Sequence, residues 1–448
     1  MERVPDPAGA THHRGHQVAP LGAASLLALG VNGIVGVGIF FAPREVAAAA
    51  PGIRGLAFYA GVALLLAPVG LVFARLGRAL VVDGGPYVYA RSAFGPRVAF
   101  AVGFTTYVSA VFSSSAVVVG LVESIFAAAG AVSPVARLGT ELALVAALML
   151  ALSRGLRLSA VMWTAVTVLK LLPLVALPLA ALLVAAPPTI GPDVYGARLG
   201  PMAAAASGGW LAAALPVLFA LQGFEVVPLP AGEVRNAEKT VPLATVGSLL
   251  IAAALYLAIH AACLRALPDL GAHPAPLADA AQVFGGPAFS HLIIAATSLS
   301  AFGIVIGMLA MTPRYLAPLG HADALGFRLD EQDARAIPRR AFGVTFVLIA
   351  AVLAASAVWG SLADLLALSS VSVTAQYAVT AAALWVLASR GAHGMSPRDR
   401  WPAPLAIASC ALLLGGATRF EIPIFLALLA LGFAARALGR AMPRPSVE

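Results

Sequence analysis

The sequence predicts an all-α polytopic membrane protein, and three observations lead to that fold class. Of the 448 residues, 60% are hydrophobic and only 11% are charged, whereas about a quarter of the residues in a soluble domain are charged. The mean hydropathy of the chain is +0.93. Apolar segments recur along almost the whole chain, and each is close to the roughly 20 residues that a helix needs to cross a bilayer.

Twelve apolar segments have the length of a transmembrane helix. We place these helices at residues 22–49, 55–79, 97–127, 135–153, 158–185, 208–231, 241–264, 286–312, 341–358, 361–389, 402–418 and 421–438. The first, third, fifth and tenth exceed the bilayer thickness, so we expect them to be tilted, interrupted or projecting. The stretch before the first is polar and lacks the apolar centre of a signal peptide, so the first segment is predicted to be a retained helix.

The distribution of basic residues predicts the orientation. If both termini are inside the cell, 21 of the 28 lysines and arginines fall on the cytoplasmic side and six fall outside. By the positive-inside rule, this bias predicts an inner (plasma) membrane protein with cytoplasmic tails at residues 1–20 and 441–448. The net charge of +8 then reflects arginines that face anionic lipid headgroups, and it requires no nucleic-acid partner.

Nothing in the sequence predicts an enzyme or a cofactor. Cys263 and Cys410 lie in or near apolar segments without a paired motif, and we interpret them as small buried hydrophobic residues. The serines at 113–115 have no histidine or lysine partner at a recognisable spacing. A cluster with metal-ligand spacing is likewise missing from the sequence.

The first apolar segment contains the glycine-rich stretch "GVNGIVGVGIFFAP", residues 30–43. Glycine lowers helix stability but lets the backbone leave helical geometry or approach another group closely. The stretch therefore predicts either an interrupted helix or a face of small residues for helix packing.

The sixth segment contains "FALQGFEVVPLPAGEVRN", residues 219–236. Its prolines, Pro228 and Pro230, remove backbone donors and disrupt a helix. Gln222 and Glu225 stand at membrane depth, where polar groups are costly and face a cavity or a partner. Non-helical backbone at this depth is tolerated only inside protein or beside water.

The two irregular stretches occupy corresponding places in two halves of five helices. Interrupted helices at matching places point to a transporter binding site between inverted repeats. We therefore divide the chain into a first repeat at 21–186, a second repeat at 207–390 and two further helices at 400–440. This division rests on the placement of the breaks, because direct similarity between the halves is weak.

Four motifs make the chain resemble the amino acid/polyamine/organocation (APC) superfamily of permeases. They are "GIVGVGIFFAP" (33–43), "DGGPYVYARSAFGP" (83–96), "FALQGFEVVPLPAGEVRNAEKTVP" (219–242) and, more loosely, "TPRYLAPLGHADALG" (312–326). The resemblance implies a leucine-transporter-like core of five plus five inverted helices, with helices 1 and 6 broken and helices 11 and 12 added. It also implies transport of amino acids or related amines by proton symport or exchange.

The resemblance further implies a substrate site at the two breaks. Its residues would be Asn32, Gly33, Ile34, Gly36, Val37, Gly38, Phe219, Ala220, Leu221 and Gly223. Backbone N–H groups at 36–38 would meet the substrate carboxylate, because a helix N-terminus is positive. Carbonyls at 32–34 and 219–221 would meet the ammonium, and Phe219 would close over it. Many relatives have Ser or Thr where this chain has Val37, which supplies its N–H but no hydroxyl to the carboxylate.

Lys170 lies in the apolar run "TAVTVLKLLPLVALPLA", residues 164–180, and Lys239 is the only other lysine. It stands about 18 Å along its helix, too deep for easy snorkelling. A buried lysine can lose its proton, whereas arginine stays charged. By resemblance, Lys170 takes the place of the second sodium ion in proton-coupled relatives.

We expect the Lys170 ammonium to bridge carbonyls around Gly33 and Ile34 to hydroxyls of helix 8. The candidate hydroxyls are Thr297, Ser298 and Ser300. Proton loss would then loosen helices 1, 5 and 8. The alternative is a permanent structural ion pair, for example with Glu225. Glu225 is itself either a second proton site or a brace of helix 6.

The third helix, "GFTTYVSAVFSSSAVVVG" (103–120), offers hydroxyls but no acid at mid-membrane depth. A cationic side chain would need such an acid, so the sequence favours neutral amino acids. The resemblance and Lys170 favour proton symport as the coupling. The alternatives are an amino acid or polyamine exchanger, a sodium-coupled symporter and a transport-inactive sensor. A channel would need a filter or a charged ring, and neither is visible.

Overall fold

The computed structural model describes residues 21–36, 38–127, 133–154, 160–184, 209–273, 275–320, 325, 329, 331–333, 337–359, 362–417 and 420–441. Regular structure in these residues is helical, apart from one isolated parallel bridge between Leu21 and Val234. The predicted all-α class is therefore correct.

The α-helices are α1 (Ala23–Ile34), α2 (Gly38–Ala49), α3 (Ile53–Ala79), α4 (Pro86–Phe94), α5 (Pro96–Ala127), α6 (Pro134–Ser153), α7 (Ala160–Leu183), α8 (Gly209–Leu221), α9 (Ala237–Ala266), α10 (Pro276–Leu316), α11 (Arg339–Trp359), α12 (Leu362–Ser389), α13 (Pro402–Leu414) and α14 (Glu421–Ala441). Short 3₁₀ turns are η2 (Phe224–Val226), η3 (Ala231–Glu233), η4 (Leu270–Ala272), η5 (Ala317–Gly320), η6 (Ala392–Gly394) and η7 (Pro397–Arg400).

Eight of the described helices are long and apolar enough to cross a membrane: α3, α5, α6, α9, α10, α11, α12 and α14. Shorter apolar helices accompany them, including α1 and parts of α7 and α8. The chain is thus a multi-pass membrane protein. The count of twelve spans, the inverted repeat and the domain limits remain predictions.

Three predicted segments differ from the structure at their ends. The segment 208–231 is α-helical only to Leu221, because Gly223 adopts a φ of +123° and 3₁₀ turns follow. The segment expected to start at 286 belongs to a longer helix, α10, with a non-helical residue at Gly286 (φ +72°) just before Pro287. The segment 402–418 ends at Leu414. The short helix α4 follows the second span and was expected only as a motif.

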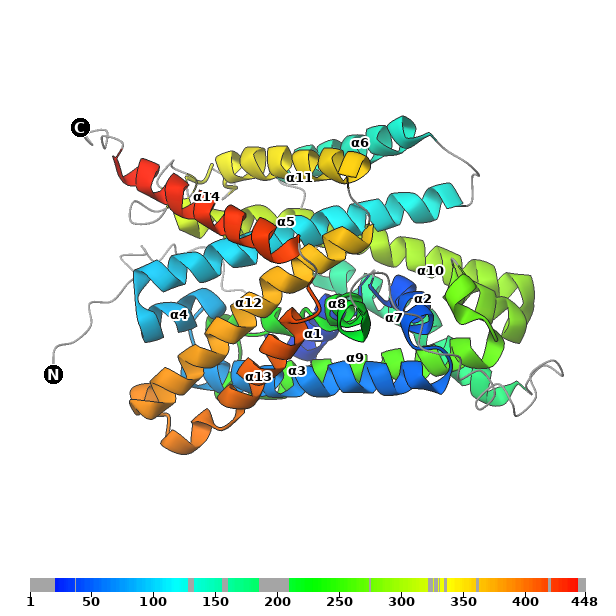
Figure 1. Cartoon of the computed structure of the whole chain (residues 1–448), viewed down its shortest axis with the longest axis horizontal. Coiled ribbons are helices and arrows are strands. Elements are labelled where there is room, and N and C mark those ends of the chain that lie inside the picture. The colour runs from blue at the N-terminus through cyan, green and yellow to red at the C-terminus, as the bar shows by residue number, and fades with distance from the viewer. Residues whose placement is uncertain are drawn as a thin grey trace.

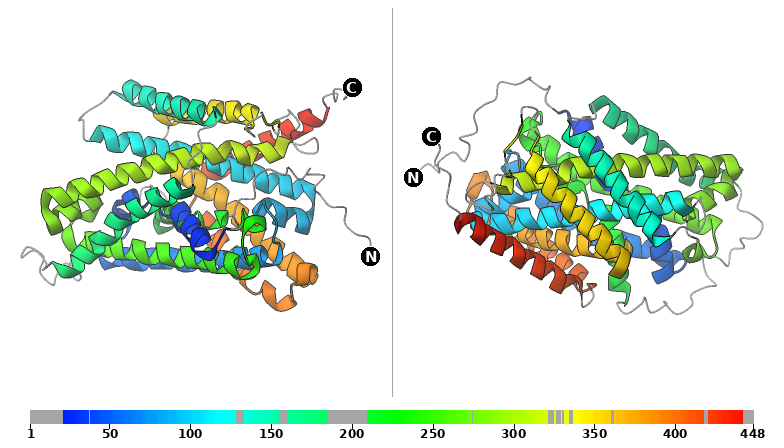
Figure 2. Two further views of the ribbon diagram at one scale, coloured as in Figure 1. Left: turned by 180° about the vertical axis from the view of Figure 1, so that it is seen from behind. Right: turned by 90° about the horizontal axis from the view of Figure 1, so that it is seen from above.

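Figure 1 shows α3 and α9 side by side along one face and α6 with α11 along the opposite face. The helices α1, α2 and α8 lie between these faces, and Figure 2 shows α6, α11 and α14 covering the molecule when it is seen from above. α5 is the most central span: 89% of its apolar window is buried, against 17% for α14. The two short half-helices are therefore enclosed by longer helices, and this enclosure protects irregular backbone.

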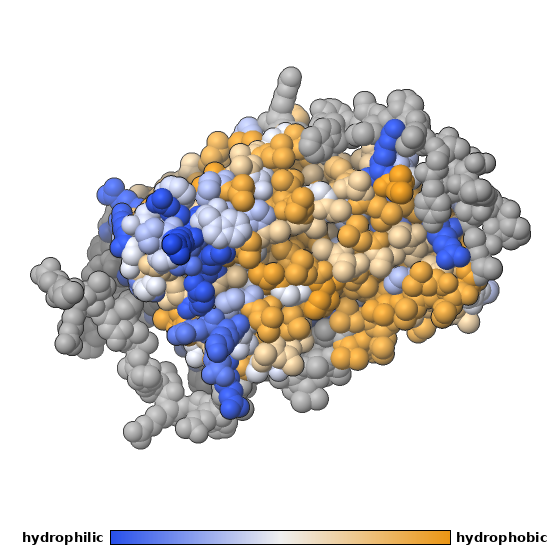
Figure 3. Space-filling model, turned by 90° about the horizontal axis from the view of Figure 1, so that it is seen from below, coloured by the Kyte–Doolittle hydropathy of each residue, from blue (hydrophilic) through white to orange (hydrophobic). Residues whose placement is uncertain are grey.

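The outer surface carries the pattern of a membrane protein. Seen from below, it has a broad hydrophobic band, with hydrophilic residues gathered mostly at one end (Figure 3). That end is where α12 connects to α13 and where α4 lies (Figure 1).

Candidate substrate and coupling site

The first predicted break is present in the structure. α1 ends at Ile34 and α2 begins at Gly38. Val35 leaves helical geometry with ψ of 85°, although its N–H still donates to Val31. The last carbonyls of α1 and the first N–H groups of α2 lack intrahelical partners. Opposite partial charges therefore meet at one place: negative at the end of α1 and positive at the start of α2.

The second break follows α8. The last helical hydrogen bond runs from the N–H of Gln222 to Leu218 at 2.8 Å. The positive φ of Gly223 then turns the chain into η2. The carbonyls of Phe219, Ala220 and Leu221 thus stand in the last turn of α8, where helix geometry leaves acceptors free.

The two breaks touch each other through their backbones. An ideal Cβ on Gly223 would lie 2.4 Å from the carbonyl oxygen of Gly33, and one on Gly38 would lie 2.6 Å from the Cα of Ala220. Only glycine permits contacts this close. Both interpretations of residues 30–43 hold, since Gly30 also packs against Ser248 and Val227 without room for a side chain.

Lys170 reaches the end of α1 from α7. The residue is only 1% exposed. Its Nζ donates to the carbonyl of Val35 at 2.6 Å and to that of Asn32 at 3.3 Å. These carbonyls flank the expected pair at Gly33 and Ile34. The Lys170 side-chain nitrogen therefore lies at the end of α1, where the free carbonyls give a negative partial charge.

Tyr256 of α9 is a contact of the first break that sequence reasoning missed. Its hydroxyl donates to the carbonyl of Ile34 at 2.9 Å, and the side chain is fully buried. Two of the carbonyls predicted for the substrate ammonium, those of Asn32 and Ile34, thus already accept hydrogen bonds from the protein.

The hydroxyls of α10 predicted to meet Lys170 differ in their surroundings. Thr297 donates to Ile294 of its own helix at 2.8 Å and is partly exposed, as is Ser298. Lys170 has no recorded hydrogen bond to either residue. The structure therefore gives Thr297 a local role within α10, because its donor is used there.

Ser300 differs from the other two hydroxyls in its burial. It is 1% exposed, and its Oγ has no hydrogen-bond partner among the described residues. Ile304 lies one turn further along the same face of α10, and its Cδ1 would lie 3.4 Å from a Cβ on Gly36. A buried, unpaired donor thus lies one helical turn from the contact with the first break.

Glu225 lies at the second break and contacts its backbone. Its Oε2 accepts hydrogen bonds from the N–H of Gly223 and from the hydroxyl of Tyr377 on α12, each at 2.7 Å. The alternative ion pair of Lys170 with Glu225 is not among the contacts of these two residues. Both instead hold broken backbone: Lys170 at the end of α1, and Glu225 just after α8.

A network of neutral polar side chains joins α5, α8 and α12. Ser113 and Ser369 share a hydrogen bond of 2.6 Å, and Gln222 donates to both at 3.2 and 3.3 Å. Nearby on the same helices, Thr106 donates to Gln376 at 2.7 Å. Sequence reasoning missed the α12 members, although "SSVSVTAQYAVT" (369–380) places unusually many polar residues in an apolar span.

Phe219 and Leu221 of the predicted site lie inside packed structure. Phe219 is 7% exposed and belongs to a core cluster with residues of α5 and α10. Leu221 is fully buried. Val37 lies outside the described residues. Cys263 and Cys410 are free buried thiols.

Two interrupted helices that meet at Gly33 and Gly223 are the arrangement expected around the binding site of a transporter. The chain belongs to the amino acid permease family, which it matches over residues 21–432. The APC resemblance of its motifs is therefore correct.

Individual relatives agree with this family. The chain is 26% identical to an uncharacterized transporter of Mycobacterium tuberculosis over 74% of this chain and 73% of that protein. It is 26% identical to a branched-chain amino acid permease of Lactococcus lactis over 78% of each. It is also 27% identical to a chloroplastic cationic amino acid transporter of Arabidopsis thaliana, over 67% of this chain and 55% of the relative.

Proposed function

We propose that this permease moves amino acids with neutral side chains by proton-coupled symport and alternating access. The observation that carries the proposal is the Lys170 ammonium on the carbonyls of Asn32 and Val35. A lysine there supplies a removable positive charge at the end of α1, where a sodium-coupled transporter would need its ion. Sodium coupling through this position is disfavoured for that reason.

In this proposal, protonated Lys170 ties α7 to the end of α1. Loss of its proton removes the charge that favours the negative helix end, and the tie weakens. The buried hydroxyl of Ser300 on α10 is the partner that we assign to Lys170 in another state of the cycle. Thr297 and Ser298 remain weaker candidates. The proton thereby couples α1, α7 and α10.

The substrate is proposed to bind between the two breaks. Its carboxylate meets N–H groups of Gly36, Val37 and Gly38 at the positive start of α2. Its ammonium meets carbonyls at the end of α8 (Phe219, Ala220, Leu221) and that of Gly33. Asn32 and Ile34 contribute less, since their carbonyls already accept from Lys170 and Tyr256.

Three features support a neutral side chain. The polar network of α5, α8 and α12 carries no charge. The single acid of α5, Glu123, forms an ion pair with Arg137 at 2.6 Å. Glu225 already accepts two hydrogen bonds. The branched-chain permease among the relatives agrees with this class, although another relative is named for cationic amino acids.

The test is uptake of a labelled amino-acid panel into proteoliposomes without sodium, with and without an inward proton gradient. We expect accumulation of neutral amino acids that depends on the gradient. Uptake only against preloaded substrate would make the protein an exchanger. No uptake without sodium would contradict the proposal and favour sodium coupling or a sensor. We place the protein in the inner membrane with both termini cytoplasmic.

A further inference from the structure

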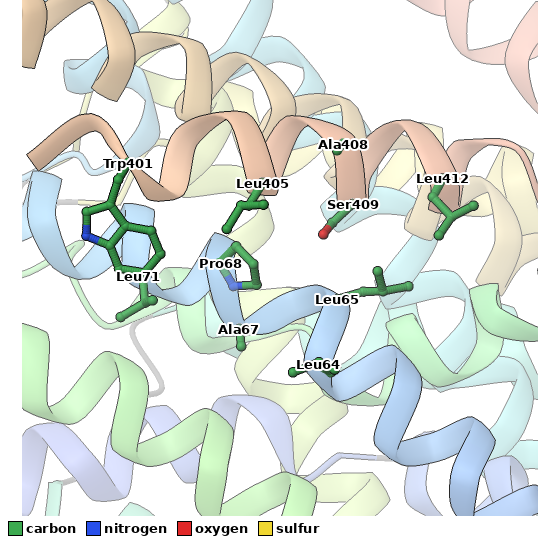
Figure 4. Close-up of a pocket in the computed structure, with 10 residues that line it drawn as sticks. All are labelled: Leu64, Leu65, Ala67, Pro68, Leu71, Trp401, Leu405, Ala408, Ser409 and Leu412. Atoms are coloured by element: carbon green, nitrogen blue, oxygen red, sulfur yellow. The ribbon is translucent and has the colours of Figure 1, made fainter.

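A groove of about 440 Å³ lies between α3 and α13 on the outside of the helix bundle (Figure 4). It is lined by Leu64, Leu65, Ala67, Pro68, Leu71, Trp401, Leu405, Ala408, Ser409 and Leu412. Apart from Ser409 and the indole N–H of Trp401, the lining is apolar. The groove is therefore matched to a hydrocarbon chain.

Side-chain size explains the groove. Ala67 and Pro68 on α3 and Ala408 and Ser409 on α13 are the smaller residues of its lining (Figure 4). The larger lining residues remain open to the surroundings, with Leu64 at 74% exposure and Leu405 at 52%.

One end of the groove is basic. The guanidinium of Arg75 lies over the ring of Trp401, 5.0 Å from its centroid. Arg78 donates to Asp399 at 3.0 Å, whereas Arg75 Nε lies 3.8 Å from the same oxygen, beyond hydrogen-bond distance. Exposed Arg398 adds a third positive charge next to Asp399. The Asp399 carboxylate therefore pairs with two arginines, Arg75 and Arg78, whose N–H donors outnumber its acceptor sites.

The arrangement of charge and apolar surface identifies the occupant. Lipid tails gain little hydrophobic free energy by entering a groove in a membrane, because they leave an equally apolar environment. Selective binding must then come from the headgroup. Arginine binds phosphate with paired N–H donors, and tryptophan is enriched at the depth of the headgroups.

We propose that this groove is a binding site for one anionic phospholipid. Its phosphate lies against Arg75 and Arg78 beside the indole of Trp401, and one acyl chain runs along α3 and α13 towards Leu412. The lipid ties the end of α3 to the segment that connects α12 to α13. This site is separate from the helix breaks and does not depend on the proposed transport mechanism.

The test uses quenching of Trp401 fluorescence by brominated lipids in vesicles that contain the full chain. Phosphatidylglycerol with brominated acyl chains in a phosphatidylcholine background is compared with the reverse labelling at the same mole fraction. The Trp401 signal is the difference between the wild type and Trp401→Phe. We expect stronger quenching by the brominated phosphatidylglycerol.

Two variants probe the two halves of the site. The pair Arg75→Gln/Arg78→Gln should lower the preference for phosphatidylglycerol by about tenfold or more, since each basic residue near anionic lipid is worth roughly fivefold in binding. Its control is Arg91→Gln/Arg97→Gln, with the same charge change on exposed arginines of α4 and α5.

Ala408→Phe fills the groove and leaves the arginines and Asp399 unchanged. It should also remove the preference, whereas Ala427→Phe on the exposed side of α14 should not. Equal quenching by both lipids in the wild type would overturn the proposal. A preference that survives either the arginine pair or Ala408→Phe would overturn it as well.

Discussion

The hydroxyl of Tyr256 and the carbonyl of Ile34, the last residue of α1, are joined by a hydrogen bond of 2.9 Å. Tyr256→Phe removes the donor and leaves a buried carbonyl with one partner fewer. We expect a loss of about 1–3 kcal/mol in stability and slower transport, measured by thermal unfolding in detergent and by uptake.

The matched control for that change is Tyr59→Phe. Tyr59 is equally buried, but its hydroxyl has no hydrogen-bond partner among the described residues. Its removal should be neutral or stabilising, because no bond is lost and an unpaired polar atom disappears. Equal effects of the two substitutions would show that the bond to Ile34 contributes nothing.

Lys170→Met keeps the length of the side chain and removes its charge. The carbonyls of Asn32 and Val35 lose their donor, so transport should fall by at least about tenfold, which corresponds to one charged hydrogen bond of roughly 1.5–3 kcal/mol. Lys170→Arg should lose the response to pH, since arginine does not release its proton. Uptake across a pH series measures both. Lys239→Met, at the exposed second lysine, should behave as the wild type, and a normal pH response in Lys170→Arg would end the proton-switch proposal.

Gly223→Ala should destabilise the second break strongly. The residue has a φ of +123°, and a Cβ would lie 2.4 Å from the carbonyl oxygen of Gly33. Backbone strain of this kind costs about 1–3 kcal/mol, before the steric overlap is counted. Gly61→Ala in α3, where a Cβ meets open space, should instead stabilise its helix by roughly 0.5–1 kcal/mol. Melting temperatures that move in the same direction for both would contradict the packing described here.

Two substitutions of Glu225 distinguish a bracing role from a role as a proton carrier. Glu225→Gln retains an oxygen that can accept from Gly223 and Tyr377, whereas Glu225→Ala retains none. We expect Gln to preserve transport and its dependence on pH, and Ala to lose transport. If the Gln variant transports but its transport no longer responds to pH, Glu225 is a proton site, and bracing alone does not explain its role.

The pKa of Asp399 leads to a prediction about the stability of the protein at low pH. Its pKa lies below the ordinary value because the backbone N–H of Ser396 donates to it, helped by the Ser396 hydroxyl, Arg78 and Arg75. Because the pKa is lowered by folding, the ionised Asp399 carboxylate stabilises the folded state fully above its unfolded-state pKa of about 3.9. This stabilisation is lost as the pH falls through the folded-state pKa.

The difference in melting temperature between the wild type and Asp399→Asn should therefore shrink below about pH 4. Asp269→Asn is the control, because Asp269 is exposed and has no recorded ion pair among the described residues. A difference that stays constant from neutral to acidic pH would exclude a titrating Asp399 as its source.

Sequence patterns predicted most helices and both breaks, because glycine and proline act locally on the backbone. They also singled out Lys170, since a lone lysine in an apolar helix is costly without a partner. They did not predict Tyr256 or Tyr377, because a tyrosine in an apolar span looks like any other core residue. Its partner is set by the packing of α9 and α12, which no local pattern contains.

The same limit explains why the sequence did not distinguish Thr297 from Ser300 as a partner of Lys170. Spacing along α10 allowed both as partners of Lys170, and only the three-dimensional packing distinguishes a hydroxyl bonded within its helix from a buried unpaired one. The neutral network of Ser113 and Ser369 needed the contact between α5 and α12, although its members were visible as polar residues in apolar spans.

The contact of Gly33 with Gly223 also has a mechanical consequence. If two side chains lay between the breaks, they could change rotamers when one half-helix moved, and the other half-helix could stay in place. A contact between two backbones has no rotamers to change, so a displacement of either half-helix should displace the other as well. The two breaks should consequently move together as a single rigid unit.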